Sequence, residues 1–258
     1  MFYGGNMHLL LTNDDGWNSE GLRCLTRALI DAGHRVTIAA PDSERSAASH
    51  SLSILKPLRA KPITVEGAKG WAIDGTPADS VRLGLHLTKD DRPDMCISGI
   101  NHGSNLGGAC IYSGTVNSAM EASMAGCPAI ATSLMKSDKY DFTLTCAETL
   151  RLIDYAVKHP LKRGRIYNLN LPAQQTIKGV YFTQTLGPDF LSEANYQAVT
   201  SNYGVTYYCL DDGPNREYFP PDCDSVKCAE GWATVSVLGW DIAEKNDASL
   251  PANGEIEL

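Results

Sequence analysis

The sequence lacks the features that would set it apart from ordinary soluble globular proteins. None of its eight cysteines forms a Cys-x-x-Cys pair or has a histidine at zinc-finger spacing, so a structural zinc site is not expected. Its apolar runs, such as Val36 to Ala40, are far too short to span a bilayer. The first seven residues show no basic patch followed by an apolar stretch, so we expect no secretory signal. We therefore expect a soluble, cytoplasmic protein with reduced thiols and no membrane partner.

The sequence also has fewer basic than acidic residues. The 258 residues include 22 Lys and Arg against 30 Asp and Glu, a formal net charge of −8. A general nucleic-acid-binding protein would show a basic excess, so we expect no stable binding to nucleic acid. A small anionic substrate stays compatible with this balance, because a bound metal ion can supply positive charge. Hydrophobic residues at 43% and charged residues at 20% describe a globular chain, long enough to fold around its own core.

Three common catalytic or cofactor motifs are missing as well. The sequence has no Gly-x-Ser-x-Gly elbow, so the triad of an α/β-hydrolase is unsupported. The glycine-rich loop Gly99 to Gly108 has neither the G-x-G-x-x-G spacing of a dinucleotide site nor the Gly-Lys-Ser/Thr of a P-loop. The sequence is therefore not expected to be an α/β-hydrolase, a dinucleotide-binding protein or a P-loop protein.

Strands and helices alternate in the first part of the chain. Apolar runs without alternation predict buried strands over residues 8–12, 35–40, 71–74, 95–98 and 129–134. Helical periodicity predicts a helix that stops at Gly33, one that opens at Thr76-Pro77, and helices over residues 113–125 and 143–158. Buried strands joined by helices are typical of a parallel sheet covered on both faces.

The pattern changes after residue 160. Residues 165–171, 180–185, 205–210 and 233–238 predict strands, and no helix is evident. We expect an α/β fold: a doubly wound α/β/α sandwich with a mostly parallel sheet and a β-rich C-terminal elaboration. Residues 7–160 would form the core that carries the site. Residues 161–258 would continue the domain with hairpins suited to subunit contacts and a loose tail.

The candidate site residues follow the predicted strands, where open parallel sheets bind ligands. Asp14 and Asp15 are adjacent carboxylates that repel each other unless a cation lies between them, which indicates a site for Mg²⁺ or Mn²⁺. An Asx-turn or a helix N-terminus would also explain the pair. The residues Ser113-Gly114-Thr115 open a helix and would cradle a phosphate, or would cap that helix. The polar loop 43–51 offers Arg45 and Ser46, or is a plain surface loop.

Taken together, these clusters resemble the SurE family of stationary-phase survival proteins, which are nucleoside monophosphate phosphatases. The matching segments, in family order, are LLLTNDDGWNSEGL, APDSERSAASHSLS, DGTPADSVRLGL, SGINHGSNLGG, YSGTVNSAMEA and YNLNLP. Two places depart from the family pattern: Gly103-Ser104-Asn105 where Gly-Pro-Asn is frequent, and Ala109-Cys110 where an acidic pair is frequent. The stretch from Asp224 through 232–237 follows the family only loosely.

The resemblance implies a Rossmann-like core and a metal-dependent phosphomonoesterase that assembles as a homodimer or homotetramer. It implies one divalent ion, Mg²⁺ or Mn²⁺, held by Asp14, Asp15, Ser46 and Asn101. It also implies substrate and phosphate contacts from Asn101, Asn105, Ser113, Gly114 and Thr115. Asp14 and Asp15 would be the catalytic residues, acting on water or on phosphorus.

The predicted reaction is hydrolysis of nucleoside 5′-monophosphates, with the 3′-isomers as further substrates, to nucleoside and phosphate. Two rival interpretations stay open. The first is a nucleotide-binding module without turnover. The second is a glycosyltransferase-like enzyme, since Gly21 to Pro41 is like the opening of one, although two Rossmann-like halves would need about twice the length.

Overall fold

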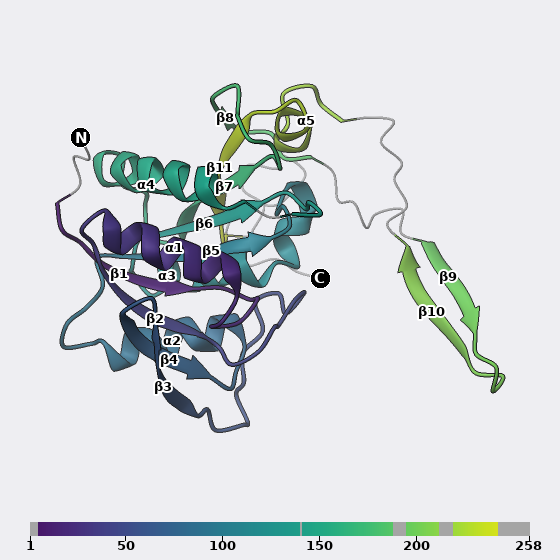
Figure 1. The fold of residues 1–258 in the computed structure, drawn as a ribbon, viewed down its shortest axis with the longest axis horizontal. Helices are drawn as coiled ribbons and strands as arrows, with labels where there is room; N and C mark the ends of the chain where they lie inside the picture. Colours follow the sequence, from purple (N-terminus) through teal and green to yellow (C-terminus); the bar gives the residue numbers. More distant parts are fainter. Residues whose placement is uncertain (1–4, 140, 188–194, 212–218, 242–258) are drawn as a thin grey trace, which may run out of the picture.

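The computed structural model describes residues 5–139, 141–187, 195–211 and 219–241. One nine-stranded sheet forms its body, in the order β3-β4-β2-β1-β5-β6-β7-β11-β8 (Figure 1). The strands are β1 (His8–Thr12), β2 (Arg35–Pro41), β3 (Ala60–Val65), β4 (Ala68–Ile73), β5 (Met95–His102), β6 (Ala129–Leu134), β7 (Arg165–Leu171), β8 (Val180–Thr183) and β11 (Ala233–Gly239).

The six central strands, β4-β2-β1-β5-β6-β7, are all parallel. Numbered by their sequence order within this set, they lie in the order 3-2-1-4-5-6 of a doubly wound sheet, so the order reverses between β1 and β5. Antiparallel strands border this set on both sides: β3 pairs with β4, and β11 pairs with β7. The predicted α/β fold with a mostly parallel sheet is confirmed.

Helices cover both faces of the sheet, each packing an apolar stripe on it. Helices α1 (Glu20–Asp31) and α4 (Thr143–Lys158) contact each other over one face, and α2 (Pro77–Leu87) and α3 (Gly114–Met124) contact each other over the opposite face. Two buried clusters result. One contains Leu22, Leu25 and Ile153, and the other contains Val81 and Met120.

Local sequence patterns located most boundaries correctly. Helix α2 begins with a capping box at Thr76. The Thr76 hydroxyl accepts from Asp79 N at 3.0 Å, and the Asp79 carboxylate accepts from Thr76 N at 2.9 Å. Helix α1 ends at Asp31, just before Gly33. Ser113 is the N-cap of α3 and not its first turn. Strand β5 runs on to His102, four residues further than predicted, before the short 3₁₀ helix η1 (Gly107–Ile111).

Two expectations were wrong or incomplete. The C-terminal part does contain a helix, α5 (Asp224–Ala229), whose six residues are too few to show helical periodicity. Strand β3 was missed because its exposed edge carries Lys61 and Pro62 in place of an apolar run. None of the helices in the described ranges is long and apolar enough to cross a membrane.

A separate two-stranded hairpin follows β8. It consists of β9 (Asn195–Thr200) and β10 (Thr206–Asp211), paired antiparallel, and it lies apart from the sheet in Figure 1. Its exposed apolar side chains include Tyr196, Val199, Tyr203, Tyr207 and Tyr208. An isolated hairpin is marginally stable in water, so these side chains are suited to cover by another surface.

Candidate active site

The candidate site lies at the carboxyl ends of β1 and β5, where the strand order reverses. Thr12 at the end of β1 pairs with Ser98 of β5, so residues that follow these positions share one edge of the sheet. The first turn of α3 reaches the same place, because Thr115 contacts Asp14. In doubly wound sheets, ligands bind in the crevice at such a reversal point.

The turn after β1 is held by Asn13 and not by the two aspartates. Asn13 Oδ1 accepts from Gly16 N at 3.1 Å, and its Nδ2 donates to Gly16 O and to Ser19 Oγ at 3.1 and 2.7 Å. Ser19 is also the N-cap position of α1. Turn formation and helix capping therefore leave the carboxylates of Asp14 and Asp15 unexplained, which favours the metal interpretation over its structural alternatives.

Asp14 is a buried carboxylate with one strong internal partner. Its side chain is 5% exposed, and its Oδ1 accepts from Thr115 Oγ1 at 2.5 Å. Burial raises the pKa of Asp14 to about 6, and the negative charge of Asp15 adds to this, while the Thr115 hydrogen bond works against it. A cation beside Asp14 would relieve the cost of burying its ionised form.

Gly114 makes room for Asp14 at the start of α3. A Cβ at Gly114 would lie 2.7 Å from Asp14 Cβ and 2.8 Å from Asp14 Oδ2, far inside van der Waals contact. It would also press on Pro77 of α2, at 3.0 Å. Glycine at this position lets the buried carboxylate lie directly against the helix N-terminus.

Asp15 lies closer to solvent than Asp14. Its Oδ2 accepts from His102 N at 3.3 Å, which ties the turn after β1 to the end of β5. Burial raises the pKa of Asp15, the His102 ring lowers it, and the nearby charge of Glu44 raises it further. The sequence reasoning did not single out Glu44.

Asn101 is the first residue of β5 to pair again with β6 after a break in strand register. The pairing between β5 and β6 shifts between Ser98 and Asn101, a stretch that includes a cis peptide bond between Gly99 and Ile100. Asn101 Nδ2 donates to Gly103 O at 2.7 Å, which leaves its Oδ1 oxygen as the atom suited to a metal.

The loop that carries Ser46 runs beside Asp14, and the polar side chains of Ser46 and Arg45 bond within the loop and to Asp42. Arg45 N donates to Asp14 O at 2.7 Å, so the backbone of the loop is fixed at the site. The exposed Ser46 Oγ donates to Glu44 Oε1 at 2.7 Å, and Arg45 pairs with Asp42 at 3.1 Å. Ser46 therefore differs from the other three residues proposed as metal ligands, because its side-chain oxygen is hydrogen-bonded to Glu44.

The first turn of α3 combines capping with contacts to Asp14. Ser113 Oγ accepts from Val116 N at 3.0 Å, so its hydroxyl caps the helix, and the Thr115 hydroxyl is used on Asp14. The N–H groups of Gly114 and Thr115 have no partner within the helix, as in any first helical turn. The Asp14 carboxylate lies against this turn, and both the hydroxyl and the backbone of Thr115 favour its ionised form.

Asn105 is buried in a polar network that the sequence did not reveal. Its Nδ2 donates to Ser133 Oγ at 2.8 Å, and its main-chain oxygen accepts from the Nδ2 atoms of Asn168 and Asn170, each at 3.0 Å. Its main-chain N–H donates to Asn170 Oδ1 at 2.7 Å. Both β7 asparagines come from the segment YNLNLP, but nothing local indicates that they would hold a loop more than 60 residues away.

The two histidines of the site loops have packing partners. His50 Nε2 lies 2.8 Å from Glu121 Oε2, and Glu121 also accepts from Arg82 through its other oxygen. The His102 ring stacks on Phe142 with centroids 5.2 Å apart.

The residues at the site fit a hard divalent cation. Asp14, Asp15 and Asn101 offer oxygen ligands at one edge of the sheet, and the shifted pKa values of the two aspartates show that burial penalises their negative charge. Three oxygen-donating side chains also leave coordination positions for water and phosphate.

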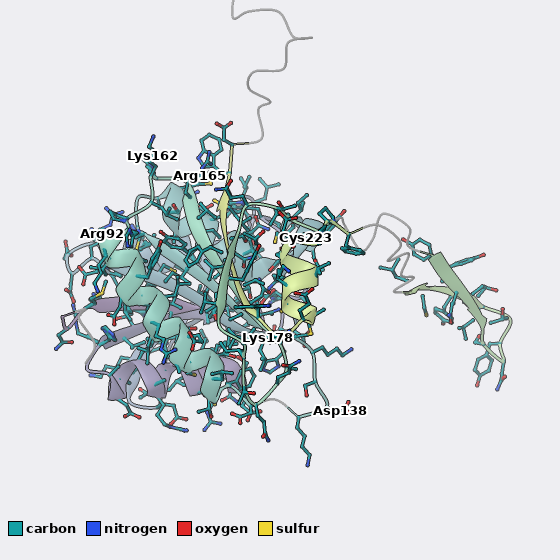
Figure 2. The ribbon with its side chains drawn as sticks, turned by 90° about the horizontal axis from the view of Figure 1, so that it is seen from above. Arg92, Asp138, Lys162, Arg165, Lys178 and Cys223 are labelled. Atoms are coloured by element: carbon teal, nitrogen blue, oxygen red, sulfur yellow. The ribbon has the colours of Figure 1, made fainter. Side chains whose placement is uncertain are left out.

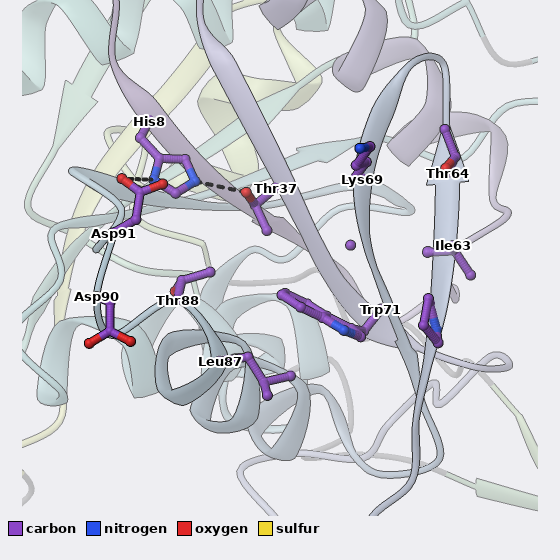
Figure 3. A pocket seen from close by; sticks show the side chains of 12 residues that line it. His8, Thr37, Ile63, Thr64, Lys69, Trp71, Leu87, Thr88, Asp90 and Asp91 are labelled. Atoms are coloured by element: carbon purple, nitrogen blue, oxygen red, sulfur yellow. Dashed lines mark hydrogen bonds and ion pairs between the residues drawn. The ribbon is translucent and has the colours of Figure 1, made fainter.

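A cavity of about 620 Å³ lies away from this site, at the amino-terminal ends of the parallel strands (Figure 3). His8, Thr37, Lys69, Trp71 and Asp91 are among its lining residues, and His8 bonds to Thr37 at 2.8 Å. It contains none of the residues proposed to bind metal or phosphate.

Comparison with known proteins agrees with the motifs. The family described as "Survival protein SurE" matches residues 9–190. Proteins named 5′-nucleotidase SurE from Gloeobacter violaceus and Moorella thermoacetica are 39% and 42% identical over 241 and 244 residues. Each alignment covers 92% of this chain and 91% of the relative.

The fold has a counterpart among solved structures. The crystal structure of the SurE protein from Aquifex aeolicus matches with a TM-score of 0.77 at 29% identity, over 92% of this chain and 94% of that one.

Proposed function

The chain belongs to the SurE family, and we propose that it acts as a 5′-nucleotidase that depends on one divalent metal ion, Mg²⁺ or Mn²⁺. The observation that carries the proposal is the pair Asp14 and Asp15, which neither turn nor cap explains, set beside the N-terminus of α3. The reaction is hydrolysis of a nucleoside 5′-monophosphate to nucleoside and phosphate.

Asp14, Asp15 and Asn101 would hold the metal, with Ser46 as a fourth ligand once its hydroxyl leaves Glu44. When bound, a divalent ion supplies charge neutralisation at the phosphoryl oxygens and lowers the pKa of bound water. The Thr115 hydroxyl keeps Asp14 ionised and oriented. Asp15 is the more exposed of the pair, so we assign it to orienting the water that attacks phosphorus as the ester P–O bond breaks.

The phosphate contacts would come from the N-terminus of α3, against which Asp14 lies. The N–H groups of Gly114 and Thr115 would hold phosphoryl oxygens at the positive end of α3, with Ser113 fixing that turn as its cap. Asn105 would contribute through the loop it anchors, since its own amide nitrogen is bonded to Ser133.

Three finer features belong to the same proposal. Nucleoside 3′-monophosphates serve as further substrates, and the protein works in the cytoplasm. The protein assembles as a homodimer or homotetramer through the β9–β10 hairpin, whose exposed tyrosines and valines need cover.

The test is phosphate release from a panel of nucleoside 5′- and 3′-monophosphates, after chelation and again after Mg²⁺ or Mn²⁺ is restored. Release that stops with chelator and returns with metal supports the proposal. Binding of the monophosphates without release would favour the binding module, and sugar transfer from a nucleotide-sugar would favour the glycosyltransferase. Asp90→Asn, which changes an exposed carboxylate remote from the site, is the matched control and should keep full activity.

A further inference from the structure

One buried carboxylate outside the proposed machinery joins three separate segments. Asp224, the first residue of α5, is 1% exposed, and both of its oxygens accept hydrogen bonds. Its Oδ2 accepts from Gly107 N at 2.8 Å, and its Oδ1 accepts from Gly187 N at 2.7 Å and from Ser225 N at 2.8 Å. A carboxylate bonded in this way fixes the relative positions of the backbones that donate to it.

The first of these segments is the substrate loop, residues 103–111, which contains Asn105. Two separate elements hold it. The β7 amides bind the main chain of Asn105, and Asp224 binds the main chain of Gly107 two residues later. Because both attachments are to the backbone, they determine where the loop lies and not only how one side chain is oriented.

The other two segments are the feet of the β9–β10 hairpin: residues 183–187, where the chain leaves the sheet, and residues 220–225, where it returns. Asp224 N donates to Thr185 O at 3.1 Å, and Thr183 Oγ1 donates to Asp222 O at 2.9 Å, so the feet are bonded to each other. Figure 2 shows α5 and Cys223, its N-cap, on the side of the body that faces the hairpin.

We propose that Asp224 is a positioning residue for the substrate loop, and that it transmits the placement of the hairpin feet to that loop. The inference rests on the proposed nucleotidase function. The carboxylate holds Gly107 through one oxygen and the foot at Gly187 through the other. A displacement of the feet therefore moves the Asp224 carboxylate, which accepts from Gly107 N, and the substrate loop moves with it. The metal ligands Asp14 and Asp15 are not bonded to this carboxylate, so their affinity for metal stays as it is.

The test compares Asp224→Asn with Gly187→Ala. The first substitution puts an amide, with one acceptor oxygen, in place of a carboxylate that has two, so either Gly107 or Gly187 loses its partner. The second adds a methyl group that would lie 2.4 Å from Ser225 Oγ and 3.4 Å from Asp224 Oδ1, so it displaces the foot without touching the loop. We expect each variant to raise KM for a nucleoside 5′-monophosphate by about tenfold, the scale of one hydrogen bond to a charged group, with a smaller change in kcat.

The double variant shows whether the effect passes through Asp224. If it does, Asp224→Asn together with Gly187→Ala raises KM no further than Asp224→Asn alone. Gly179→Ala is the matched control, because its added methyl presses on Trp232 near the same helix but not on Asp224. It should lower Tm and leave KM unchanged. Mn²⁺ affinity, measured by calorimetry, should be the same in all variants.

A purely structural role for Asp224 would overturn the inference. In that case Tm falls and kcat scales with the folded fraction, while KM stays at the wild-type value. Multiplicative KM effects in the double variant would overturn the transmission from foot to loop. Failure of the proposed function looks different, because the wild-type protein itself would then release no phosphate with any metal.

Discussion

Asp14→Asn should make the metal-free protein more stable while abolishing its activity. The wild-type carboxyl is buried against Gly114 and Thr115, and the interactions that shift its pKa in the described part of the chain include no cationic side chain. Asparagine has nearly the same shape but cannot ionise. The variant thus removes the buried negative charge and little else, because the Thr115 hydroxyl can rotate to suit the amide.

The size of the effect follows from the pKa. Burial raises the pKa of Asp14 from 3.8 to about 6, so between these values the folded chain holds a proton that the unfolded chain has lost. Stability therefore falls as the pH rises through this window, and the full loss is present above pH 6. At about 1.4 kcal/mol for each pH unit of the window, the cost is about 3 kcal/mol, or about 6–12 °C in Tm for a chain of this size.

The measurement is thermal or urea unfolding of both proteins in chelator, at about pH 7.5 and at about pH 4.5, on either side of the titration of Asp14. Asp14→Asn should be the more stable at the higher pH, and the difference should shrink from about 3 to about 1 kcal/mol at the lower pH, which lies inside the window between the two pKa values. Added Mn²⁺ should raise the Tm of the wild type and leave that of the variant unchanged. The exposed Asp90→Asn should show neither effect.

The reasoning is refuted if Asp14→Asn is the less stable protein in chelator at the higher pH, or if the difference does not change with pH. Either result would mean that the buried charge of Asp14 does not destabilise the metal-free fold. The aspartate pair would then give no energetic reason to expect a cation at the site. Nucleotide hydrolysis by Asp14→Asn at the wild-type rate would separately contradict the assignment of Asp14 to the metal site.

Three further predictions concern the same residues and the hairpin. Gly114→Ala should lower metal affinity and kcat by about tenfold or more, because the added methyl would lie 2.7 Å from Asp14 Cβ; metal titration and steady-state kinetics check this. Thr115→Val removes the donor that lowers the pKa of Asp14, so the acid limb of the pH profile of kcat/KM should move to higher pH; an unchanged limb would count against this role. If the hairpin forms the proposed subunit contact, replacing the exposed Tyr196 and Tyr207 by serine should lower the molar mass in light scattering toward that of the monomer, with the Tm of the core little altered.

Local patterns were sufficient to predict the fold class and that the clusters after β1 and β5 lie near each other. The apolar run before Asn13 and the capping box at Thr76 each depend on residues within a few positions of one another, which a single sequence displays. The parallel sheet then follows from the alternation of strands and helices. Because the carboxyl ends of neighbouring strands meet, the clusters after β1 and β5 could be expected at one edge.

The details of the site depend on contacts across long stretches of sequence, and these could not be predicted. The hydroxyl of Thr115 looked like a phosphate ligand, but in the structure it bonds to Asp14, 101 positions earlier in the chain. Asn105 is expected from the family resemblance to contact substrate, and the sequence gives no sign that its side-chain amide is buried and donates to Ser133. Helix α5 was missed because its six residues are held by the tertiary bonds of Asp224 and not by propensity.

The span between Gly107 and Asp224 also has a consequence for synthesis of the protein. A ribosome makes the chain from the N-terminus, so Asp14, Asp15 and the substrate loop emerge well before the carboxylate that fixes the loop, 117 residues later. At roughly 5–20 residues per second, this delay lasts about 6–23 seconds. During that interval the loop lacks its bond from Gly107 to Asp224, so this part of the candidate site is completed only near the end of translation.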